Sequence, residues 1–253
     1  MKGGCANVIL TDRVPMDAGR PPVPALLATG AVHHHLIRAG LRSECSIVVE
    51  TASVFSTHHA AMLLGYGAHA VVPYLAYETC RQWRASARTA ALVKSGKVPD
   101  VSVEQAQKNF KKSVEKGILK ILSKMGISLL QCYHGAQIFE AYGLGPDVVD
   151  LAFRGSVSRI GGMSLGDLQR EAEAFWAKGF PERALSKLED YGFIQSKAKG
   201  EWRGRRGRRA AGVRGFHLWW SGVERRAGGW RRQAERALGP LAPLFGCRAR
   251  PLR

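Results

Sequence analysis

The feature that most constrains the fold is an alternation of β-branched and helix-like segments in the first 80 residues. The pattern predicts strands at 6–12, 45–50 and 69–74, separated by helices at 22–38 and 57–66. Short connections between strand and helix imply parallel pairing through crossover helices, which gives an α/β fold. The strands are continuously apolar, so we expect a sheet covered on both faces. An open doubly wound sheet and part of a (β/α)-barrel fit this alternation equally well.

The following 100 residues are richer in helix-like sequence. The apolar spacing predicts one strand at 127–132 and helices at 75–95, 103–125, 135–142, 147–153 and 165–178. Gly126 is expected to end one of these helices, and Ser164 is expected to cap the start of another.

Composition changes abruptly near residue 201. The formal net charge of +18 raises nucleic acid or an anionic membrane as a partner. Residues 201–253 hold 14 Arg against three Glu, a net +11, whereas residues 1–200 hold 24 basic and 17 acidic side chains, a net +7. The 201–253 tail is rich in Arg, Gly and Trp without sustained periodicity, so we interpret it as out-of-frame or disordered sequence. A nucleic-acid-binding tail is the alternative.

Several classes are excluded by simple patterns. No apolar run approaches the roughly 18 residues that a transmembrane helix needs, so no membrane partner is expected. Residues 1–5 lead directly into a predicted strand rather than into the apolar core of a signal peptide. The five cysteines are far apart and include no Cys-x-x-Cys motif, which indicates a reduced compartment and argues against a disulfide framework.

The most visible chemical cluster consists of histidines with one carboxylate between them: His33, His34, His35, Glu50, His58 and His59. Imidazole and carboxylate are zinc ligands, so a metal site would take one histidine from each group plus the carboxylate. Three consecutive helical residues point about 100° apart, however, and cannot converge on one ion. No His-Glu-x-x-His motif is present. We therefore predict that these imidazoles pack and hydrogen-bond between helix and sheet.

Other chemical signals are weak. Cys5 could act as an N-terminal nucleophile after trimming, but it leads straight into a strand. Gly65 and Gly67 lack the spacing of dinucleotide or P-loop motifs. Lys124 and Arg159, each near a glycine, could hold an anion, although such cations are equally ordinary at helix ends and surfaces. No Ser-His-Asp set can be picked out, and we assign no catalytic, cofactor-binding or metal-binding residue.

A small stand-alone α/β enzyme is one alternative function. Asp12, Glu50 and Tyr74 each lie at the end of a predicted strand. Because active sites of parallel α/β folds form at the carboxyl ends of the strands, these three side chains mark where such a site would lie.

Several stretches, in order and in register, resemble the central region of the large chain of glutamate synthase. The resemblance covers about residues 3–200 and stops near residues 200–202. The runs that carry it are 23–38 (VPALLATGAVHHHLIR), 47–50 (IVVE), 58–59 (HH), 64–68 (LGYGA), 73–76 (PYLA), 116–120 (KGILK), 123–128 (SKMGIS), 135–141 (GAQIFEA) and 158–162 (SRIGG).

The resemblance implies an enzyme of ammonia assimilation, which makes glutamate from glutamine-derived ammonia and 2-oxoglutarate. In that family a glutaminase domain releases ammonia, and an FMN barrel supplied through an iron–sulfur cluster performs the synthesis. Ferredoxin or an NAD(P)H-oxidising subunit donates the electrons. By resemblance, residues 1–160 are the C-terminal part of the central domain, a partial (β/α)-barrel-like unit, and residues 161–200 lead into the FMN domain. The implied location is the cytoplasm or the plastid stroma.

The departures from the family pattern decide what this chain is expected to do. The catalytic cysteine domain, the closely spaced cluster cysteines and most of the FMN barrel are missing. Leu129 stands where Thr is expected, and Cys132 and His134 replace Ser and a basic residue. We therefore expect a structural connector between the glutaminase and FMN domains, inactive alone and without a cofactor of its own. The missing barrel half should leave apolar surface uncovered.

Overall fold

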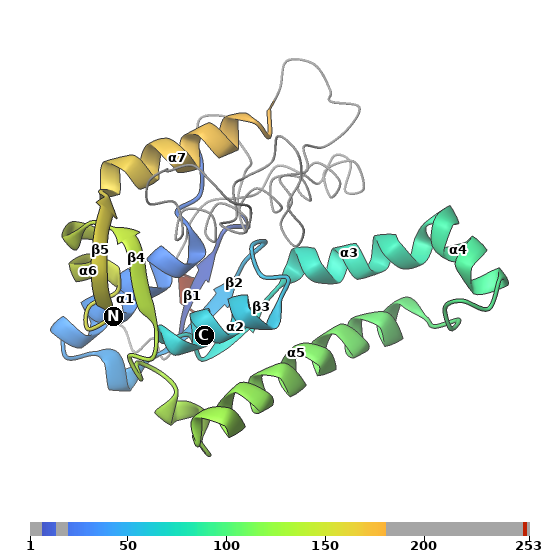
Figure 1. Cartoon of the computed structure of the whole chain (residues 1–253), viewed down its shortest axis with the longest axis horizontal. Helices are drawn as coiled ribbons and strands as arrows, with labels where there is room; N and C mark the ends of the chain where they lie inside the picture. The colour runs from blue at the N-terminus through green and yellow to red at the C-terminus, as the bar shows by residue number, and fades with distance from the viewer. Residues whose placement is uncertain (1–6, 14–19, 181–249, 252–253) are drawn as a thin grey trace, which may run out of the picture.

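A parallel sheet and two crossover helices form the first part of the chain (Figure 1). The structure is a computed structural model, which describes residues 7–13, 20–180 and 250–251. The elements are β1 (Asn7–Thr11), α1 (Ala25–Arg38), the 3-10 turn η1 (Arg42–Glu44), β2 (Ser46–Glu50), α2 (Thr57–Gly65) and β3 (Ala70–Val72). β2 pairs in parallel with β1 and with β3, which confirms the predicted α/β alternation. The short β6 (Arg250–Pro251) pairs antiparallel with β1.

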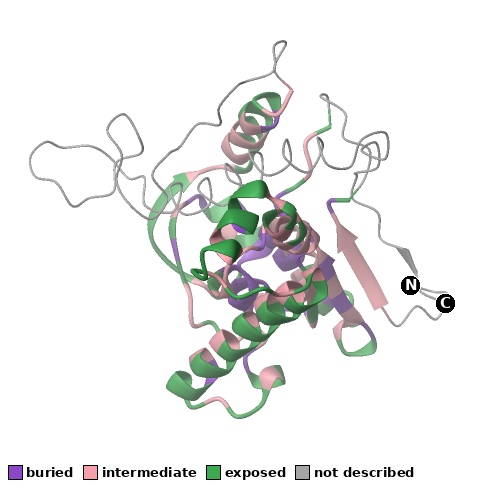
Figure 2. Ribbon diagram, turned by 90° about the vertical axis from the view of Figure 1, so that its right-hand side faces the viewer, coloured by how far each residue is buried: buried purple, intermediate pink, exposed green. Residues whose placement is uncertain are grey.

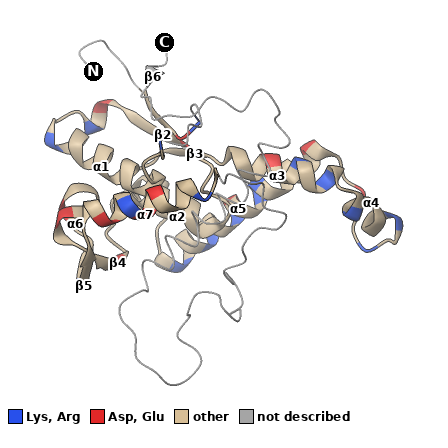
Figure 3. Ribbon diagram, turned by 90° about the horizontal axis from the view of Figure 1, so that it is seen from above, with Lys and Arg blue, Asp and Glu red and all other residues tan. Residues whose placement is uncertain are grey.

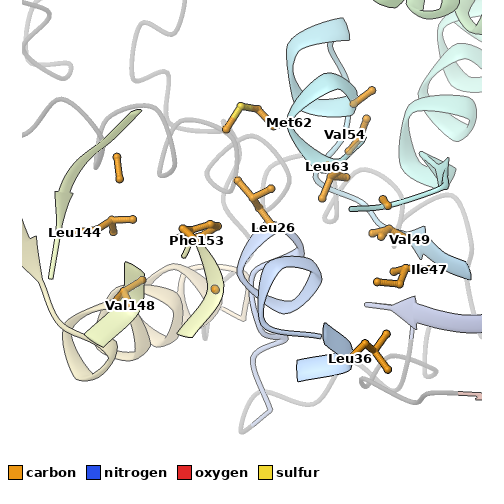
Figure 4. Close-up of a cluster of buried hydrophobic side chains, with 14 of the residues drawn as sticks. Leu26, Leu36, Ile47, Val49, Val54, Met62, Leu63, Leu144, Val148 and Phe153 are labelled. Carbon is orange, nitrogen blue, oxygen red and sulfur yellow. The ribbon is translucent and has the colours of Figure 1, made fainter. Parts of the chain in front are cut away.

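The main core lies between this sheet, the crossover helices and a second strand–helix unit (Figure 4). Ile47 and Val49 of β2 are fully buried, and they alternate with residues that are only partly buried. One face of β2 therefore carries the core, and the residues of its other face are partly buried. Figure 2 shows the buried residues gathered at the centre of the described chain. The core side chains labelled in Figure 4 are Leu26, Leu36, Ile47, Val49, Val54, Met62, Leu63, Leu144, Val148 and Phe153.

A second, smaller parallel unit follows. It consists of β4 (Glu140–Leu144), α6 (Pro146–Ala152) and β5 (Val157–Met163), and it continues into α7 (Leu165–Ala177). β4 and β5 pair in parallel, with two irregularities of register. The described strands thus form two open sheets, of orders β3-β2-β1-β6 and β4-β5. The α/β class is confirmed, whereas the barrel-like part of the prediction is not confirmed.

Three helices extend away from the first sheet as an arm (Figure 1). They are α3 (Tyr74–Ala85), α4 (Ala87–Lys94) and α5 (Val103–Met125). The prediction of a single helix at 75–95 is wrong, because Ser86 adopts an extended backbone and its hydroxyl accepts the N–H of Thr89, which starts a new helix. The predicted helix 103–125 is confirmed at both ends, and Gly126 closes it in the left-handed conformation.

Two further predictions, both in the segment after α5, are wrong. Residues 127–132 contain the 3-10 turn η2 (Leu130–Cys132) instead of a strand, because Ile127 and Leu130 pack around buried Tyr133. Residues 135–142 do not form a helix, since Gly135 and Gln137 have positive φ angles of 69° and 52°. The end of that segment enters β4 instead. The predictions for 147–153 and 165–178 are confirmed by α6 and α7.

The 201–253 tail lies outside the described residues except for β6, so its predicted disorder or out-of-frame origin stays a prediction. Within the described ranges, no helix combines the length and the apolar character that crossing a bilayer requires.

The first testable prediction concerns the contact between α1 and α6. A Cβ atom added at Gly30 would lie 2.0 Å from the carbonyl oxygen of Ala152, and backbone cannot rotate away as a side chain can. Gly30→Ala should therefore lower the free energy of unfolding by about 3 kcal/mol, measured by urea denaturation. The matched control is Gly166→Ala in α7, where the nearest atom is 3.8 Å away and stability should be unchanged or slightly higher. Equal stability of both variants would contradict the close contact.

Candidate functional site

The carboxyl ends of β1, β2 and β3 meet around the buried side chain of Asp12, which is 8% exposed. Its carboxylate accepts the Thr51 hydroxyl at 2.7 Å and the Tyr74 hydroxyl at 2.8 Å. The backbone N–H of Ala52 reaches both carboxylate oxygens, at 3.1 and 3.2 Å. One side chain after β1 is thereby bound to the loop after β2 and to the first residue of α3. This position follows from the parallel pairing, which brings the three strand ends to one edge.

Glu50 forms a second, more exposed part of the same cluster. Its two oxygens accept the Thr11 hydroxyl at 2.8 Å and the Arg13 guanidinium at 2.9 Å. The guanidinium carbon of Arg13 also lies 4.9 Å from the centre of the Tyr74 ring, within cation–π range. The structure therefore brings together Asp12, Glu50 and Tyr74, as their places at the strand ends predict.

What this cluster can do chemically is limited by its own hydrogen bonds. Asp12 accepts from three groups, and both Glu50 oxygens have donors. A general base needs a carboxylate that can reach a substrate proton, and a nucleophile needs an accessible lone pair. Here those positions are used to hold strands and helix together. The arrangement acts as a structural lock between the strand ends and α3.

The predicted packing role is confirmed for His59 and His33, which are buried or partly buried, whereas His35 and His58 are exposed. His59 is buried, its Nδ1 accepts the Phe55 N–H at 3.5 Å, and its ring meets the Phe55 ring edge-on. No group of three or more His, Cys, Asp or Glu side chains in the described part of the chain is arranged to hold a metal ion. The three described cysteines, Cys45, Cys80 and Cys132, are free thiols. These residues do not fit an iron–sulfur cluster or a zinc site.

An arginine–histidine cluster at the opposite ends of the strands was not predicted. The Arg42 Nε donates to His33 Nδ1 at 2.9 Å, and its two terminal nitrogens donate to the carbonyls of Cys45 and Gly67 at 3.0 and 2.9 Å. His69 and His134 stack edge-on beside it, with ring centres 5.0 Å apart.

The fixed guanidinium sets the chemistry of that cluster. Burial, and then the positive charge of Arg42, lower the pKa of His33 from 6.5 to about 4. The same two causes lower the pKa of His69, and burial lowers that of His134. All three imidazoles are therefore neutral near pH 7; His33 accepts from Arg42 and His69 accepts from the Ile47 N–H, whereas His134 packs against His69. The only signal in the sequence was Arg42 itself, a lone cation just before a buried strand.

The glycines and cations that the sequence offered as possible anion-binding residues have packing or surface roles in the structure. A Cβ atom at Gly65 would lie 2.4 Å from the Phe139 ring, so this glycine permits close packing rather than phosphate binding. Gly67 has a φ of 109°, and its carbonyl is one of the acceptors of Arg42. Arg159 is an exposed ion-pair partner of Glu140, at 3.8 Å. Lys124 is an exposed residue in the last turn of α5, and Cys5 lies outside the described residues.

The start of α7 is the remaining place where a phosphate group could bind. The N–H of Leu165 donates to Asp147 at 2.9 Å, and Ser164 and Asp167 form a capping box. The helix N-terminus is thus satisfied by two carboxylates, which repel an anion. This helix start therefore does not fit the phosphate of a flavin nucleotide.

An open parallel α/β unit is the class that this geometry defines. The sequence pattern of the family "Glutamate synthase central domain" matches residues 1–145, more than half of the chain. The chain belongs to the glutamate synthase central-domain family, as its motifs indicated.

The relatives are long enzymes. The chain is 58% identical over 203 residues to "Ferredoxin-dependent glutamate synthase, chloroplastic" of Spinacia oleracea, covering 80% of this chain and 12% of that protein. It is 57% identical over 203 residues to "Ferredoxin-dependent glutamate synthase 1, chloroplastic/mitochondrial" of Arabidopsis thaliana, with the same coverage of 80% and 12%. It is 49% identical over 205 residues to "Ferredoxin-dependent glutamate synthase 2" of Synechocystis, covering 80% and 13%. The chain thus spans about an eighth of the length of these relatives.

The second prediction tests the structural role of Asp12. Removing its carboxylate leaves the Thr51 and Tyr74 hydroxyls and the Ala52 N–H without their acceptor. Asp12→Ala should therefore lower the free energy of unfolding by about 2–4 kcal/mol in a urea titration. Asp150→Ala, at an exposed position of α6, is the control and should change stability by less than about 0.5 kcal/mol. A fully stable Asp12→Ala protein would refute the lock.

The third prediction concerns pH. Burial lowers the pKa of His59 to about 4, whereas the unfolded chain takes up this proton near 6.5. Between these values the unfolded state binds more protons, so stability must fall as the pH drops. For His59 the loss from pH 7 to pH 5 should be about 2 kcal/mol.

Urea titrations at both pH values check this. His59→Gln should reduce the loss of stability between the two pH values by about 2 kcal/mol, and His33, whose pKa is also about 4, retains its own contribution. His35→Gln, at an exposed position one turn from the end of α1, should leave the pH dependence unchanged. The same pH slope in His59→Gln as in the unmodified chain would show that another group carries the effect.

Proposed function

We propose that this chain serves as the structural connector of a glutamate synthase, between its glutaminase and FMN domains, and holds no catalytic residue of its own. One observation carries the proposal. The strand ends, where a parallel α/β fold places an active site, are occupied by the hydrogen bonds of Asp12 with Thr51 and Tyr74 and by those of Glu50 with Thr11 and Arg13. Membership of the central-domain family supports the same role.

The activity of the long enzyme is part of the proposal. It makes glutamate from glutamine-derived ammonia and 2-oxoglutarate, with FMN and an iron–sulfur cluster held by other parts. The described residues here fit neither group. The names of the relatives favour ferredoxin over a nicotinamide-oxidising subunit as the electron donor. The word "chloroplastic" in the spinach name favours the plastid stroma over the cytoplasm.

The domain division is proposed on the same basis. Residues 1–160 form the C-terminal part of the central domain, and residues 161–200 lead into the FMN domain. Residues 201–253 form the Arg-rich tail. The family match to residues 1–145 supports the first of these three parts.

The two alternative functions have less support. A stand-alone enzyme needs reactive groups at the strand ends, and the cluster there is closed on itself. A nucleic-acid-binding role rests on the tail, of which the structure describes only Arg250 and Pro251.

The fourth prediction tests the connector role with a chimeric enzyme that carries this chain. The corresponding segment of the spinach enzyme, 58% identical over 203 residues, is replaced by that of this chain. The chimera should form glutamate from glutamine and 2-oxoglutarate at a rate within about ten-fold of the parent, because a connector needs only its shape and contacts. The matched control is the same chimera with Asp12→Ala, which should lose activity together with stability.

The connector role also predicts that the isolated chain is inactive. Purified alone, it should show no flavin absorbance and no glutamate formation. Turnover by the isolated chain, or bound FMN, would contradict the connector role. An inactive chimera that folds and retains its flavin would contradict it as well.

A further inference from the structure

The arginine–histidine cluster joins four segments that are distant in the sequence. His33 belongs to α1, Arg42 to η1, His69 to the loop just before β3, and His134 to the segment between η2 and β4. The turn η1 has no buried residue of its own, so the hydrogen bonds of Arg42 are its main attachment to the rest of the first unit. Short segments with few buried contacts are the parts of a fold that open most readily.

Two imidazoles of the cluster are held as hydrogen-bond acceptors by fixed N–H donors. The Nδ1 of His33 accepts from Arg42 Nε at 2.9 Å, and the Nδ1 of His69 accepts from the backbone N–H of Ile47 at 3.2 Å. A neutral imidazole has one acceptor nitrogen, whereas a protonated imidazole has only donors. A proton taken up at either Nδ1 would therefore place two donors against each other, and that hydrogen bond would be lost.

Arg42 cannot relieve this conflict while η1 stays in place. A guanidinium keeps its charge throughout the pH range of a folded protein, and the two terminal nitrogens of Arg42 are bound to the carbonyls of Cys45 and Gly67. A Cβ atom at Gly67 would lie 2.3 Å from His33 Nδ1, so this glycine also packs closely against the imidazole. The His33 ring is thus confined between Gly67 and Arg42, and the way to separate the two cations is to move η1.

No carboxylate contacts the cluster in the described part of the chain. Burial lowers the pKa of His33 to about 4, and neighbouring positive groups add to this effect. These groups are Arg42, His34, His134 and His69. Glu44, the acid of η1, is exposed and forms no ion pair within the described ranges. The other titratable or basic side chains of the surrounding segments are His35, Arg38, Cys45, Tyr66, Cys132, Tyr133 and Arg154.

Two further observations show that the repulsion would be local. The Nε2 of His134 is buried without a hydrogen-bond partner, and it is the one such side-chain atom among the residues that the structure describes. The cluster therefore holds no spare acceptor that could take up an added proton. Figure 3 shows Lys and Arg gathered around α4, at the opposite end of the molecule from α1, so the arm contributes little to the charge at this place.

We propose that η1 is a proton-operated latch: protonation of His33 and His69 displaces Arg42 and moves η1 away from α1 and from the start of β2, while the two sheets stay folded. This is a property of the first unit itself and goes beyond the connector role. Because the closed latch lowers the pKa of His33 from 6.5 to about 4, the open latch binds the proton more tightly. The latch is therefore closed at pH 7, and opening becomes more favourable as the pH falls below about 6.5.

Cys45, at the end of η1, reports the state of the latch. Its carbonyl accepts from Arg42, its thiol donates to the carbonyl of Leu41 at 3.4 Å, and the residue is 6% exposed. Dithiodipyridine reacts with thiols at acid as well as at neutral pH, and it should label Cys45 only when η1 opens. Cys132 is exposed, so its labelling is the internal reference for the pH dependence of the reagent.

The experiment labels the full chain at pH 7 and at pH 5, and tandem mass spectrometry assigns the label to each cysteine. The rate for Cys45 relative to Cys132 should rise about ten-fold or more, because His33 alone shifts the opening equilibrium by about twenty-fold over this interval. The relative rate for Cys80, which is half-buried in the arm, should not change. The far-ultraviolet circular dichroism should also stay constant, since the sheets remain folded.

The double variant His33→Gln/His69→Gln tests the cause. Glutamine offers an amide oxygen to the N–H groups of Arg42 and Ile47 but takes up no proton, so the rise in Cys45 labelling should disappear. The matched control, His35→Gln/His58→Gln, removes two exposed imidazoles and should keep the full rise. If the first double variant is already open at pH 7, the single variants His33→Gln and His69→Gln decide, and each should reduce the rise.

Three results would overturn the proposal: no rise in Cys45 labelling, the same rise in both double variants, or a rise together with labelling of Cys80 and loss of circular dichroism. The last result would show acid unfolding of the whole chain, to which the buried His59 contributes. None of these results bears on the connector role, which the chimera tests through glutamate formation.

Discussion

The buried carboxylate of Asp12 is the interaction on which the first sheet depends. It lies just beyond β1, and its partners belong to the loop after β2 and to the start of α3. A carboxylate can be buried at acceptable cost only when several donors surround it, and here four hydrogen bonds do so. The same bonds fix where the helical arm leaves the sheet, because Tyr74 is the first residue of α3. The hydrogen bonds of Asp12 thus join the strand ends to one another and fix the start of the helical arm.

The sequence is most informative where local and tertiary preferences agree. β1, β2, α1 and α5 combine regular apolar spacing with clear stop residues, and the structure follows them closely. It is least informative between α5 and β4. There the apolar run at 127–132 packs around Tyr133 instead of joining a sheet, which depends on contacts distant in sequence. The break at Ser86 is a similar case, since a serine inside an apolar pattern can either continue a helix or cap a new one.

The candidate site likewise has features that the sequence predicts and features that it does not. That Asp12, Glu50 and Tyr74 meet follows from parallel topology, which sequence periodicity reveals. Which donors their carboxylates find does not follow, because it depends on side-chain directions and on Thr51 and Arg13 nearby. The contact of Arg42 with His33 is also invisible in the sequence, since it needs the positive φ of Gly67 and the precise crossing of α1 over the start of β2.

The meeting of Gly30 with Ala152 has a mechanical consequence. At this one point α1 and α6 approach without a side chain between them, so no rotamer change there can absorb relative movement. A joint of this kind is stiff in compression, and displacement of one unit is passed directly to the other. A unit built in this way resists compression along this contact, so its two sheets cannot move closer together there without displacing backbone.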